Sequence, residues 1–322
     1  MKAAVIYQAG EMPQYSEIAK PMVQHDDEVL VQVKAVAIKH LDKSKASGKH
    51  YSSEAGATVQ IVGSDGVGIL PNGQRIYGVG VDGTMSEQAV FRKDWCAFVP
   101  YGLDDALAAA LPNAVAGSAM ALRFRAALQP GETVLINGAT GFTGRIAVQL
   151  AKYYGAGKII VTGRNEAALN TLFDLGADEI VSLKRDDEAF VNQLKMIHAV
   201  TPIQVVVDYL WGHSAELILS ALKGKGTFTT RTRFVSIGAM SGDKINLSSQ
   251  ILRSIDLQLS GSGLGSWTKD EMRLLFQEIL PEIFQLAADK KITMDVITVQ
   301  LPNIEKLWDM EVVSGKRLVV MI

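Results

Sequence analysis

The chain has 322 residues, of which 48% are hydrophobic, so it is too long for one compact core of ordinary size and apolar enough to fill two. Its 32 basic and 34 acidic residues give a formal net charge of −2, which excludes a strong field for nucleic acid or an anionic membrane. Cys96 is the only cysteine, which excludes an intramolecular disulfide and a zinc site made of this chain's cysteines. We expect a small-molecule partner, no nucleic acid and no membrane.

Two apolar segments bear on the location of the protein. Residues 1–7 form a run too short for the core of a signal peptide, which argues against secretion and for the cytoplasm. The most apolar stretch, residues 106–122, is interrupted by Pro112 and Asn113 and is shorter than the ~20 residues that span a bilayer. We predict a buried helix and a turn there.

Short alternating segments separated by glycines fill the chain up to about residue 100. Strand patterns occupy residues 2–7, 28–34, 60–63, 75–80 and 86–91. We expect the intervening Gly66, Gly68, Gly73 and Gly83 to supply turns. This part of the sequence predicts a small β-rich domain.

From about residue 119 strands alternate with helices, which is typical of βαβ units and a parallel sheet. The pattern predicts six strands, enough for a complete doubly wound sheet, at 133–137, 158–162, 179–183, 204–208, 234–237 and 257–260. Helical periodicity occupies residues 143–154, 166–175, 187–198 and 214–222. A long helical stretch at 269–288 and strand-like segments at 292–299 and 317–322 follow, and we expect this tail to return to the first domain.

A glycine-rich turn joins the first of these six strands to an amphipathic helix. Gly141 lets the backbone approach a pyrophosphate closely, Gly144 lets the helix pack on the strand, and the helix start offers backbone N–H groups to the negative charge. We therefore predict that the turn holds a nicotinamide cofactor, with a purely structural turn as the alternative. The residues expected around the pyrophosphate are Ala139, Thr140, Gly141, Phe142 and Thr143.

The end of the second strand indicates which cofactor binds. Folds that prefer NAD place a carboxylate about 20 residues beyond the glycine turn, but this chain has Gly163, Arg164 and Asn165 there. An arginine suits a 2′-phosphate through charge-assisted hydrogen bonds, so the sequence predicts NADPH. Two alternatives stay open: Arg164 is a solvated residue before a helix, or Glu166 allows NAD to bind.

The chain resembles the medium-chain dehydrogenase/reductase superfamily over nearly its whole length. The resemblance is carried by residues 36–38 with Asp42, by Val-Gly-Ser-Asp-Gly-Val-Gly at 62–68, by Pro-Gly-Glu-Thr-Val-Leu-Ile at 130–136 and by Leu-Gly-Ala-Asp at 175–178. It implies an α/β protein with a discontinuous GroES-like β-rich catalytic domain, residues 1–118 and 264–322. A doubly wound, parallel-sheet Rossmann domain would occupy residues 119–263.

The metal ligands of that superfamily are missing from this sequence. Its zinc alcohol dehydrogenases bind the catalytic metal through a Cys, a His and a second Cys or Asp, whereas Lys39 and Ser64 stand at the first two positions here. The four-cysteine lobe for structural zinc is absent, and the histidines lack metal-ligand spacing. The chain therefore resembles the zinc-independent quinone oxidoreductases related to zeta-crystallin, which implies NADPH and no metal.

The chain also departs from that group. Its members often carry an asparagine near the Lys39 position, and a lysine and a tyrosine that hold the 2′-phosphate. Ala167 and Leu183 fall near the last two positions, so Arg164 must do more of this work. The glycine-rich, basic segment 223–232 is interpreted as a mobile loop, with a role at the cofactor edge as the alternative.

Hydride transfer from a nicotinamide needs alignment of the reacting carbons, exclusion of water and stabilisation of charge on the substrate oxygen. Without zinc, hydrogen-bond donors or solvent must stabilise that charge, so a quinone or enone suits the site better than a simple ketone. We predict Lys39 and Tyr51 as the catalytic residues, Lys39 near the nicotinamide ribose or substrate oxygen and Tyr51 as a proton donor. The alternative for each is a solvated surface side chain. Asp42 and Asp65 are expected to serve local turns and hydrogen bonds.

The resemblance also implies a nicotinamide pocket at the ends of the fifth and sixth strands. Ile237, Gly238, Gly261 and Ser262 would line the ring and its carboxamide. Trp211 and Trp267 either border this pocket or pack in the core.

The sequence thus favours a cytoplasmic NADPH-dependent reductase of a quinone, enone or aldehyde. One alternative is an enoyl-thioester reductase, and another is a non-catalytic protein that senses NADPH. Because residues 257–260 form the edge strand that pairs across a two-fold axis in many relatives, we also expect a homodimer.

Overall fold

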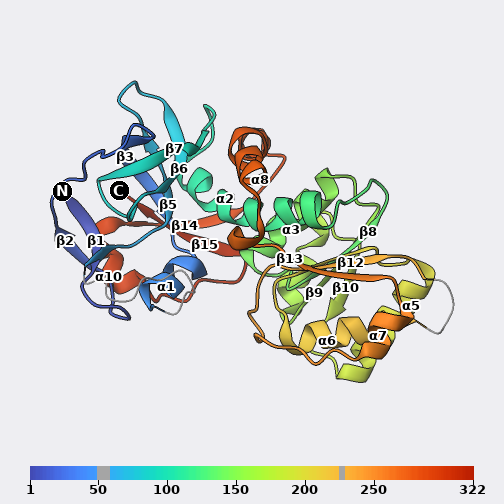
Figure 1. Ribbon diagram of the computed structural model, residues 1–322. Helices are drawn as coiled ribbons and strands as arrows, with labels where there is room; N and C mark the ends of the chain where they lie inside the picture. Colours follow the sequence, from blue (N-terminus) through green and yellow to red (C-terminus); the bar gives the residue numbers. More distant parts are fainter. Residues whose placement is uncertain (49–58, 225–228) are drawn as a thin grey trace. The chain divides into compact units, whose positions relative to one another are not determined.

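The computed structural model describes residues 1–48, 59–224 and 229–322 (Figure 1). Its contacts divide the chain into two compact units, Met1–Pro112 with Met272–Ile322 and Asn113–Glu271. The domain limits inferred from the resemblance, 118/119 and 263/264, stay a prediction of where the functional domains divide.

The first unit is built mainly of β-strands. Its six-stranded sheet has the order β14 (Asp295–Gln300), β15 (Lys316–Met321), β3 (Glu28–Ala37), β5 (Asp65–Ile69), β6 (Arg75–Gly80), β7 (Gln88–Phe98). An additional pairing of β3 with β7 closes four of these strands into a barrel. A second, three-stranded sheet consists of β2 (Gln14–Glu17), β1 (Lys2–Ile6) and β4 (Gln60–Ile61).

The C-terminal tail completes this β-rich unit. β15 pairs antiparallel with β3, placing Val319 opposite Ala37, so the expected return of the tail to the first domain is confirmed. β5 was not predicted, because two of its five residues are glycines that we assigned to turns. Gly68 lies inside β5 because a Cβ there would approach Val31 Cγ1 to 2.3 Å, leaving no room for a side chain between the packed strands.

Short helices complete the first unit: α1 (His40–Ala46), α9 (Leu280–Ala288) and α10 (Ile304–Leu307). The long helix predicted at 269–288 consists of α8 (Lys269–Leu274), a π-helical turn (Leu275–Ile279) and α9. Pro281 stands in the first turn of α9 and has no backbone N–H, which accounts for the irregular turn just before it.

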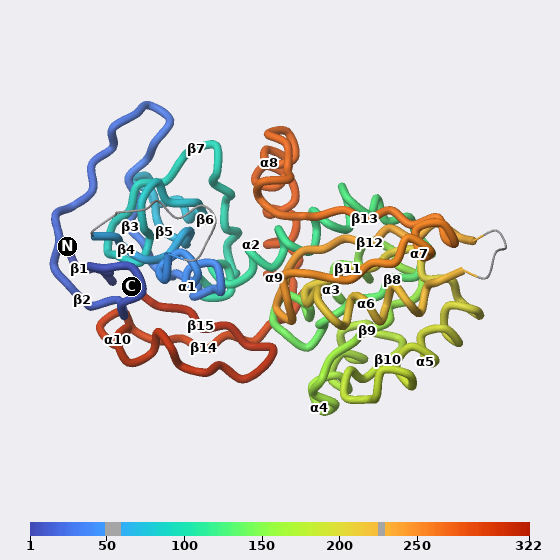
Figure 2. Tube along the Cα trace, turned by 60° about the horizontal axis from the view of Figure 1, so that its bottom comes forward, coloured from blue at the N-terminus to red at the C-terminus, as the bar shows by residue number. Residues whose placement is uncertain are grey.

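The second unit contains a six-stranded parallel sheet, and all six predicted strands are present. Its order is β10 (Glu179–Ser182), β9 (Lys158–Gly163), β8 (Thr133–Asn137), β11 (Val205–Asp208), β12 (Thr232–Ser236), β13 (Leu257–Gly261), and Figure 2 shows this order. Every residue of β8 is buried, as expected for a central strand covered on both faces. The chain order reverses between β8 and β11, which is the switch point of a doubly wound sheet.

Helices cover both faces of this sheet. α5 (Asp187–Val200) and α6 (Gly212–Ala221) pack on one face against Leu135, Val206 and Phe234, whereas α3 (Phe142–Tyr153) lies on the other (Figure 1). The helix predicted at 166–175 is shorter than expected. α4 (Glu166–Asn170) ends where Thr171 Oγ1 donates to Ala168 O, and a 3-10 turn (Phe173–Leu175) precedes Gly176 with φ +110°. A further helix, α7, spans Ser249–Ser254.

The helix formed by the apolar stretch 106–122 runs without a break where a turn was predicted. α2 (Asp105–Met120) passes through Pro112 and continues as a π-helix, Ala121–Arg125. Its neighbours Leu111 and Ala114 are fully buried, so packing outweighs the ~3 kcal/mol that an internal proline costs a helix. Within the described ranges this is the one helix long and apolar enough to cross a membrane, and 72% of its apolar window is buried, as in a core helix.

Candidate functional site

The glycine turn lies at the carboxyl end of β8, the central strand of the parallel sheet. Gly138 has φ +86°, a left-handed conformation that favours glycine. A Cβ on Gly144 would lie 2.5 Å from Ala139 Cα, so this glycine allows α3 to pack on the turn as expected. Gly141 is the N-cap of α3, and a Cβ on Gly141 would meet no atom within 4 Å. The backbone is therefore open on its outer side, which fits a pyrophosphate at the helix start.

A buried polar network holds this edge of the sheet in place. Asn137 Nδ2 donates to Asp208 Oδ1 at 2.7 Å and to Ser214 Oγ at 2.9 Å, and Asn137 Oδ1 accepts from Thr162 Oγ1 at 2.6 Å. Thr162 Oγ1 also accepts from the Gly138 amide at 3.2 Å. The network joins the ends of β8, β9 and β11 under the glycine turn. Sequence reasoning missed this network, because its partners are 24 to 77 residues apart.

Asp208 shapes the loop that follows β11. Its carboxylate accepts hydrogen bonds from the amides of Leu210 at 2.9 Å and Trp211 at 3.1 Å. Burial raises the pKa of Asp208, and these two amides and Asn137 act against that shift. The bonds support a left-handed turn, with φ +54° at Trp211 and +56° at Gly212. The Trp211 ring packs on Phe234 with centroids 6.0 Å apart, so Trp211 belongs to the core, as its packing alternative proposed.

The residues expected near the adenosine ribose lie at the end of β9. Gly163 ends the strand, and a Cβ there would approach Thr140 Cγ2 to 2.6 Å, so the two loops are in close contact. Asn165 Oδ1 accepts from Ala168 N at 3.0 Å and caps α4. Arg164 is exposed and has no partner among the described residues.

Arg164 borders a cavity of about 100 Å³ at the carboxyl ends of β9, β10 and β11. The polar residues of its wall are Arg164, Arg185, Asp187, His213, Ser214 and Ser241. Arg185, two residues after Leu183, was not singled out from the sequence. The sequence signal that could have indicated it is a basic residue shortly after the third predicted strand, 179–183.

The residues expected at the nicotinamide lie at the same edge of the sheet. Ile237 and Gly238 follow β12 and donate their amides to Asp208 O at 2.8 and 3.3 Å. Gly261 ends β13, and the amide of the buried Ser262 donates to Ser236 O at 2.8 Å. The structure thus brings the predicted pyrophosphate, ribose and nicotinamide residues to one edge of the parallel sheet.

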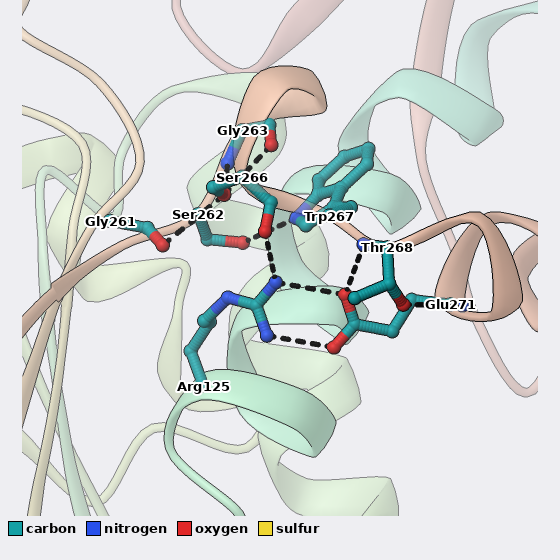
Figure 3. A network of polar contacts seen from close by, with 8 residues as sticks. All are labelled: Arg125, Gly261, Ser262, Gly263, Ser266, Trp267, Thr268 and Glu271. Carbon is teal, nitrogen blue, oxygen red and sulfur yellow. Dashed lines mark hydrogen bonds and ion pairs between the residues drawn. The ribbon is translucent and has the colours of Figure 1, made fainter.

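A network of polar contacts fixes the segment after β13 (Figure 3). The Arg125 guanidinium bonds both carboxylate oxygens of Glu271 at 2.8 and 2.9 Å and also donates to Ser266 O at 2.6 Å. Arg125 lowers the pKa of Glu271 to about 2 through these hydrogen bonds. Trp267 Nε1 donates to Ser262 Oγ at 3.0 Å. Trp267 therefore holds the loop that carries Ser262.

In the first unit, Lys39 lies in a buried cluster of charges. Only 3% of Lys39 is exposed, and its Nζ is 2.9 Å from Asp65 Oδ1, 3.1 Å from Asp42 Oδ2 and 3.3 Å from Ala37 O. Three acceptors match the three ammonium hydrogens. Burial lowers the pKa of Lys39, but the Asp42 and Asp65 carboxylates outweigh this effect and raise it above its ordinary value. Lys39 is not the solvated surface residue of the alternative.

The two acidic residues link Lys39 to further groups. The Ser64 amide and hydroxyl both donate to Asp42 Oδ1 at 2.9 Å, so the two lost ligand positions, Lys39 and Ser64, meet at one carboxylate. Burial lowers the pKa of Arg317 to about 10, and the nearby Asp65 and Asp42 act against that shift. Two cations and two carboxylates thus balance in charge. The described ranges contain no group of three His, Cys, Asp or Glu side chains able to hold a metal ion. Tyr51 lies outside the described residues.

Comparison with known proteins places the chain in a family. The family model described as zinc-binding dehydrogenase matches residues 143–280. Quinone oxidoreductase of Sus scrofa is 26% identical over 270 residues, which cover 81% of this chain and 78% of the relative. An Emericella nidulans protein described as a probable NADPH-dependent quinone reductase is 25% identical over 346 residues, covering 96% of each. The chain belongs to the quinone oxidoreductase branch of the medium-chain dehydrogenase/reductase superfamily.

The structural comparison agrees in fold. The quinone oxidoreductase of Thermus thermophilus, solved alone and with NADPH, aligns with a TM-score of 0.76 at 23% identity over 100% of both chains. The predicted fold class, a GroES-like unit with a Rossmann unit, is confirmed, and the chain is an enzyme of this family. Although the family model is described by zinc binding, Lys39 and Ser64 stand at two ligand positions of the zinc enzymes.

Proposed function

We propose that the protein is a zinc-independent reductase that transfers hydride from NADPH to a quinone or to another activated alkene or carbonyl compound. The observation that carries this proposal is the open backbone of Gly141 at the start of α3, followed at the end of β9 by Arg164 and no carboxylate. The Emericella nidulans relative, described as a probable NADPH-dependent quinone reductase, and the NADPH complex of the Thermus thermophilus enzyme support NADPH as the cofactor. The relatives described as quinone oxidoreductases support the substrate class.

The chain's own residues would bind and orient the cofactor along the sheet edge. The turn 139–144 and the first turn of α3 receive the pyrophosphate, and Gly163, Arg164 and Asn165 flank the adenosine ribose. Ile237, Gly238, Gly261 and Ser262 orient the nicotinamide, with the last two held by the Arg125–Glu271 network. When bound, NADPH supplies the hydride, so the protein's task is alignment and exclusion of water.

Lys39 contributes fixed charge in this proposal and does not donate a proton. Its raised pKa keeps the ammonium protonated, and its hydrogens are directed at Asp42, Asp65 and Ala37 O. The same contacts support zinc independence, because the Lys39 ammonium is already paired with the Asp42 and Asp65 oxygens that would otherwise be available to bind a metal ion. The proton that accompanies the hydride comes from Tyr51 or from solvent.

Steady-state oxidation of NADPH against a panel of quinones, enals and enoyl-CoA tests the proposed function. We expect consumption with quinones or enones that survives removal of metal by a chelator. Turnover with enoyl-CoA alone would support the enoyl-thioester reductase. Tight NADPH binding without consumption of any acceptor would support the sensor, and metal-dependent turnover would contradict zinc independence.

We further propose a cytoplasmic homodimer that pairs through β13. β13 is an edge strand of the parallel sheet, and it leaves Leu259 36% exposed. Sedimentation or light scattering measures the mass in solution, and a monomeric mass would contradict the dimer.

A further inference from the structure

Two arginines that face one cavity have no ion-pair partner among the described residues. Of the twelve arginines in the sequence, Arg164 and Arg185 alone have no hydrogen bond, ion pair or ring contact with the described residues. The others bond carboxylates, amides, hydroxyls or carbonyls, or lie over aromatic rings, as Arg125, Arg233 and Arg92 illustrate. Like charges that share a wall repel each other unless an anion lies between them. The pair therefore has the charge arrangement of an anion site.

The fold brings these two side chains together. β9 and β10 are parallel neighbours in which Gly163 lies opposite Ser182, so Arg164 and Arg185 follow adjacent strand ends. The cavity between them measures about 100 Å³, well above the ~10–15 Å³ that admits one water. Its wall is completed by four apolar residues, Leu183, Phe190, Leu210 and Leu217, whose surface strengthens electrostatic attraction to a bound anion.

One acidic residue, Asp187, faces the same cavity as the two arginines, so the wall keeps an excess of positive charge. Asp187 Oδ2 lies 2.9 Å from His213 Nε2, and Glu216 Oε2 lies 3.7 Å from His213 Nδ1. Ser214 lines the same wall, and its hydroxyl accepts from Asn137 Nδ2 at 2.9 Å and donates to Trp211 O at 3.1 Å. Asp187 therefore does not remove the excess positive charge that Arg164 and Arg185 provide.

We infer that Arg185 is a specificity-determining residue that clamps, together with Arg164, the 2′-phosphate by which NADPH differs from NADH. A phosphate monoester carries −1.5 to −2 charges and three acceptor oxygens, which match two guanidinium forks. The cavity wall contains no residue of the turn 139–144, so this site is separate from the pyrophosphate. The inference rests on the proposed function, and it assigns to Arg185 the second contact that the sequence left without a residue.

The test compares R185Q and R164Q with K184Q. Lys184 is the exposed neighbour of Arg185 and does not line the cavity, so K184Q removes the same charge from the same loop. Calorimetry with adenosine 2′,5′-bisphosphate and adenosine 5′-monophosphate separates the 2′-phosphate from the shared nucleotide. We expect R185Q and R164Q each to lower the affinity for the bisphosphate by about 10- to 100-fold and to leave the affinity for the monophosphate within about twofold. K184Q should change neither affinity by more than about threefold.

The outcomes separate the two proposals. If R164Q loses affinity for the bisphosphate and R185Q does not, the clamp is overturned while NADPH dependence stands. If R185Q and K184Q lose affinity equally, general charge explains the effect and the clamp is also overturned. If the unmodified protein binds neither NADPH nor NADH, the proposed function itself fails. Both arginines are exposed, and circular dichroism of each variant verifies that it remains folded.

Discussion

Replacing Lys39 by methionine tests the buried charge cluster directly. The ammonium is the shared partner of Asp42 and Asp65, whose exposed fractions are 2% and 6%. Removing it leaves two carboxylates buried close together without that cation, and breaking a buried ion pair in this way costs about 3–5 kcal/mol. With a urea m-value of about 1–3 kcal/mol/M, we expect the unfolding midpoint at pH 8 to fall by about 1 M or more.

The loss should depend on pH with a defined sign. Burial already raises the pKa of Asp65, and without the ammonium the folded-state pKa of this carboxyl rises further. The folded variant then binds more protons than the unfolded chain, so its stability falls as pH rises above the unfolded pKa of about 4. The deficit of Lys39→Met relative to the unmodified protein should therefore be smaller near pH 5 than at pH 8.

Urea unfolding at both pH values provides the measurement, with Lys43→Met as the control. Lys43 lies on α1, the helix that Lys39 precedes, and its ion pair at 3.7 Å is with the exposed Asp309. Such an exposed ion pair is worth about 0–1 kcal/mol. Because a two-domain chain need not unfold in one step, midpoints are compared instead of extrapolated free energies. A Lys39→Met protein as stable as the control at pH 8 would refute the buried charge pairing.

Three further predictions concern the parallel-sheet unit. Gly141→Ala puts a methyl group into open space, so it should change the free energy of unfolding by no more than about 1 kcal/mol. It should weaken the binding of NADPH and of NADH to the same extent, as measured by calorimetry. Gly144→Ala puts the methyl 2.5 Å from Ala139 Cα, so it should lower the melting temperature as well, and equal stability of the two variants would contradict the geometry. The hydrogen bond to Asp187 raises the pKa of His213. As pH rises through that pKa, His213 loses its charge and Asp187 loses a cationic partner, so the affinity for NADPH should fall while the affinity for NADH should not. Arg125→Met should raise KM for both cofactors by loosening the loop of Ser262, and an effect on only one cofactor would refute this positioning role.

Strands β8, β9 and β11 of the parallel sheet were predictable because they contain continuous apolar runs followed by glycines or polar residues. β8, with five buried residues followed by the glycine turn, is the clearest case. β5 was missed because its glycines look like turns until the neighbouring strands are present. The helix through Pro112 was missed because packing overrides the local cost of proline. Local signals thus predicted the elements, and tertiary packing decided the exceptions.

The candidate site was predictable in part for a similar reason. The glycine turn and Arg164 follow strands whose position in the fold the resemblance supplied. The surroundings of Lys39 were not predictable, because Asp65 lies 26 residues away and its contact exists only after folding. Arg185 was missed because its relation to Arg164 depends on the pairing of β9 with β10. Side chains that meet through sheet pairing leave no signature in sequence spacing.

The most direct test of the proposed function is the ratio of kcat/KM for NADPH to that for NADH with one quinone acceptor, measured before and after treatment with a chelator. We expect quinone-dependent turnover, a preference for NADPH of about tenfold or more from charge-assisted contacts to its 2′-phosphate, and no loss after chelation. A preference for NADH, or activity that disappears with the metal, would contradict a zinc-independent NADPH reductase.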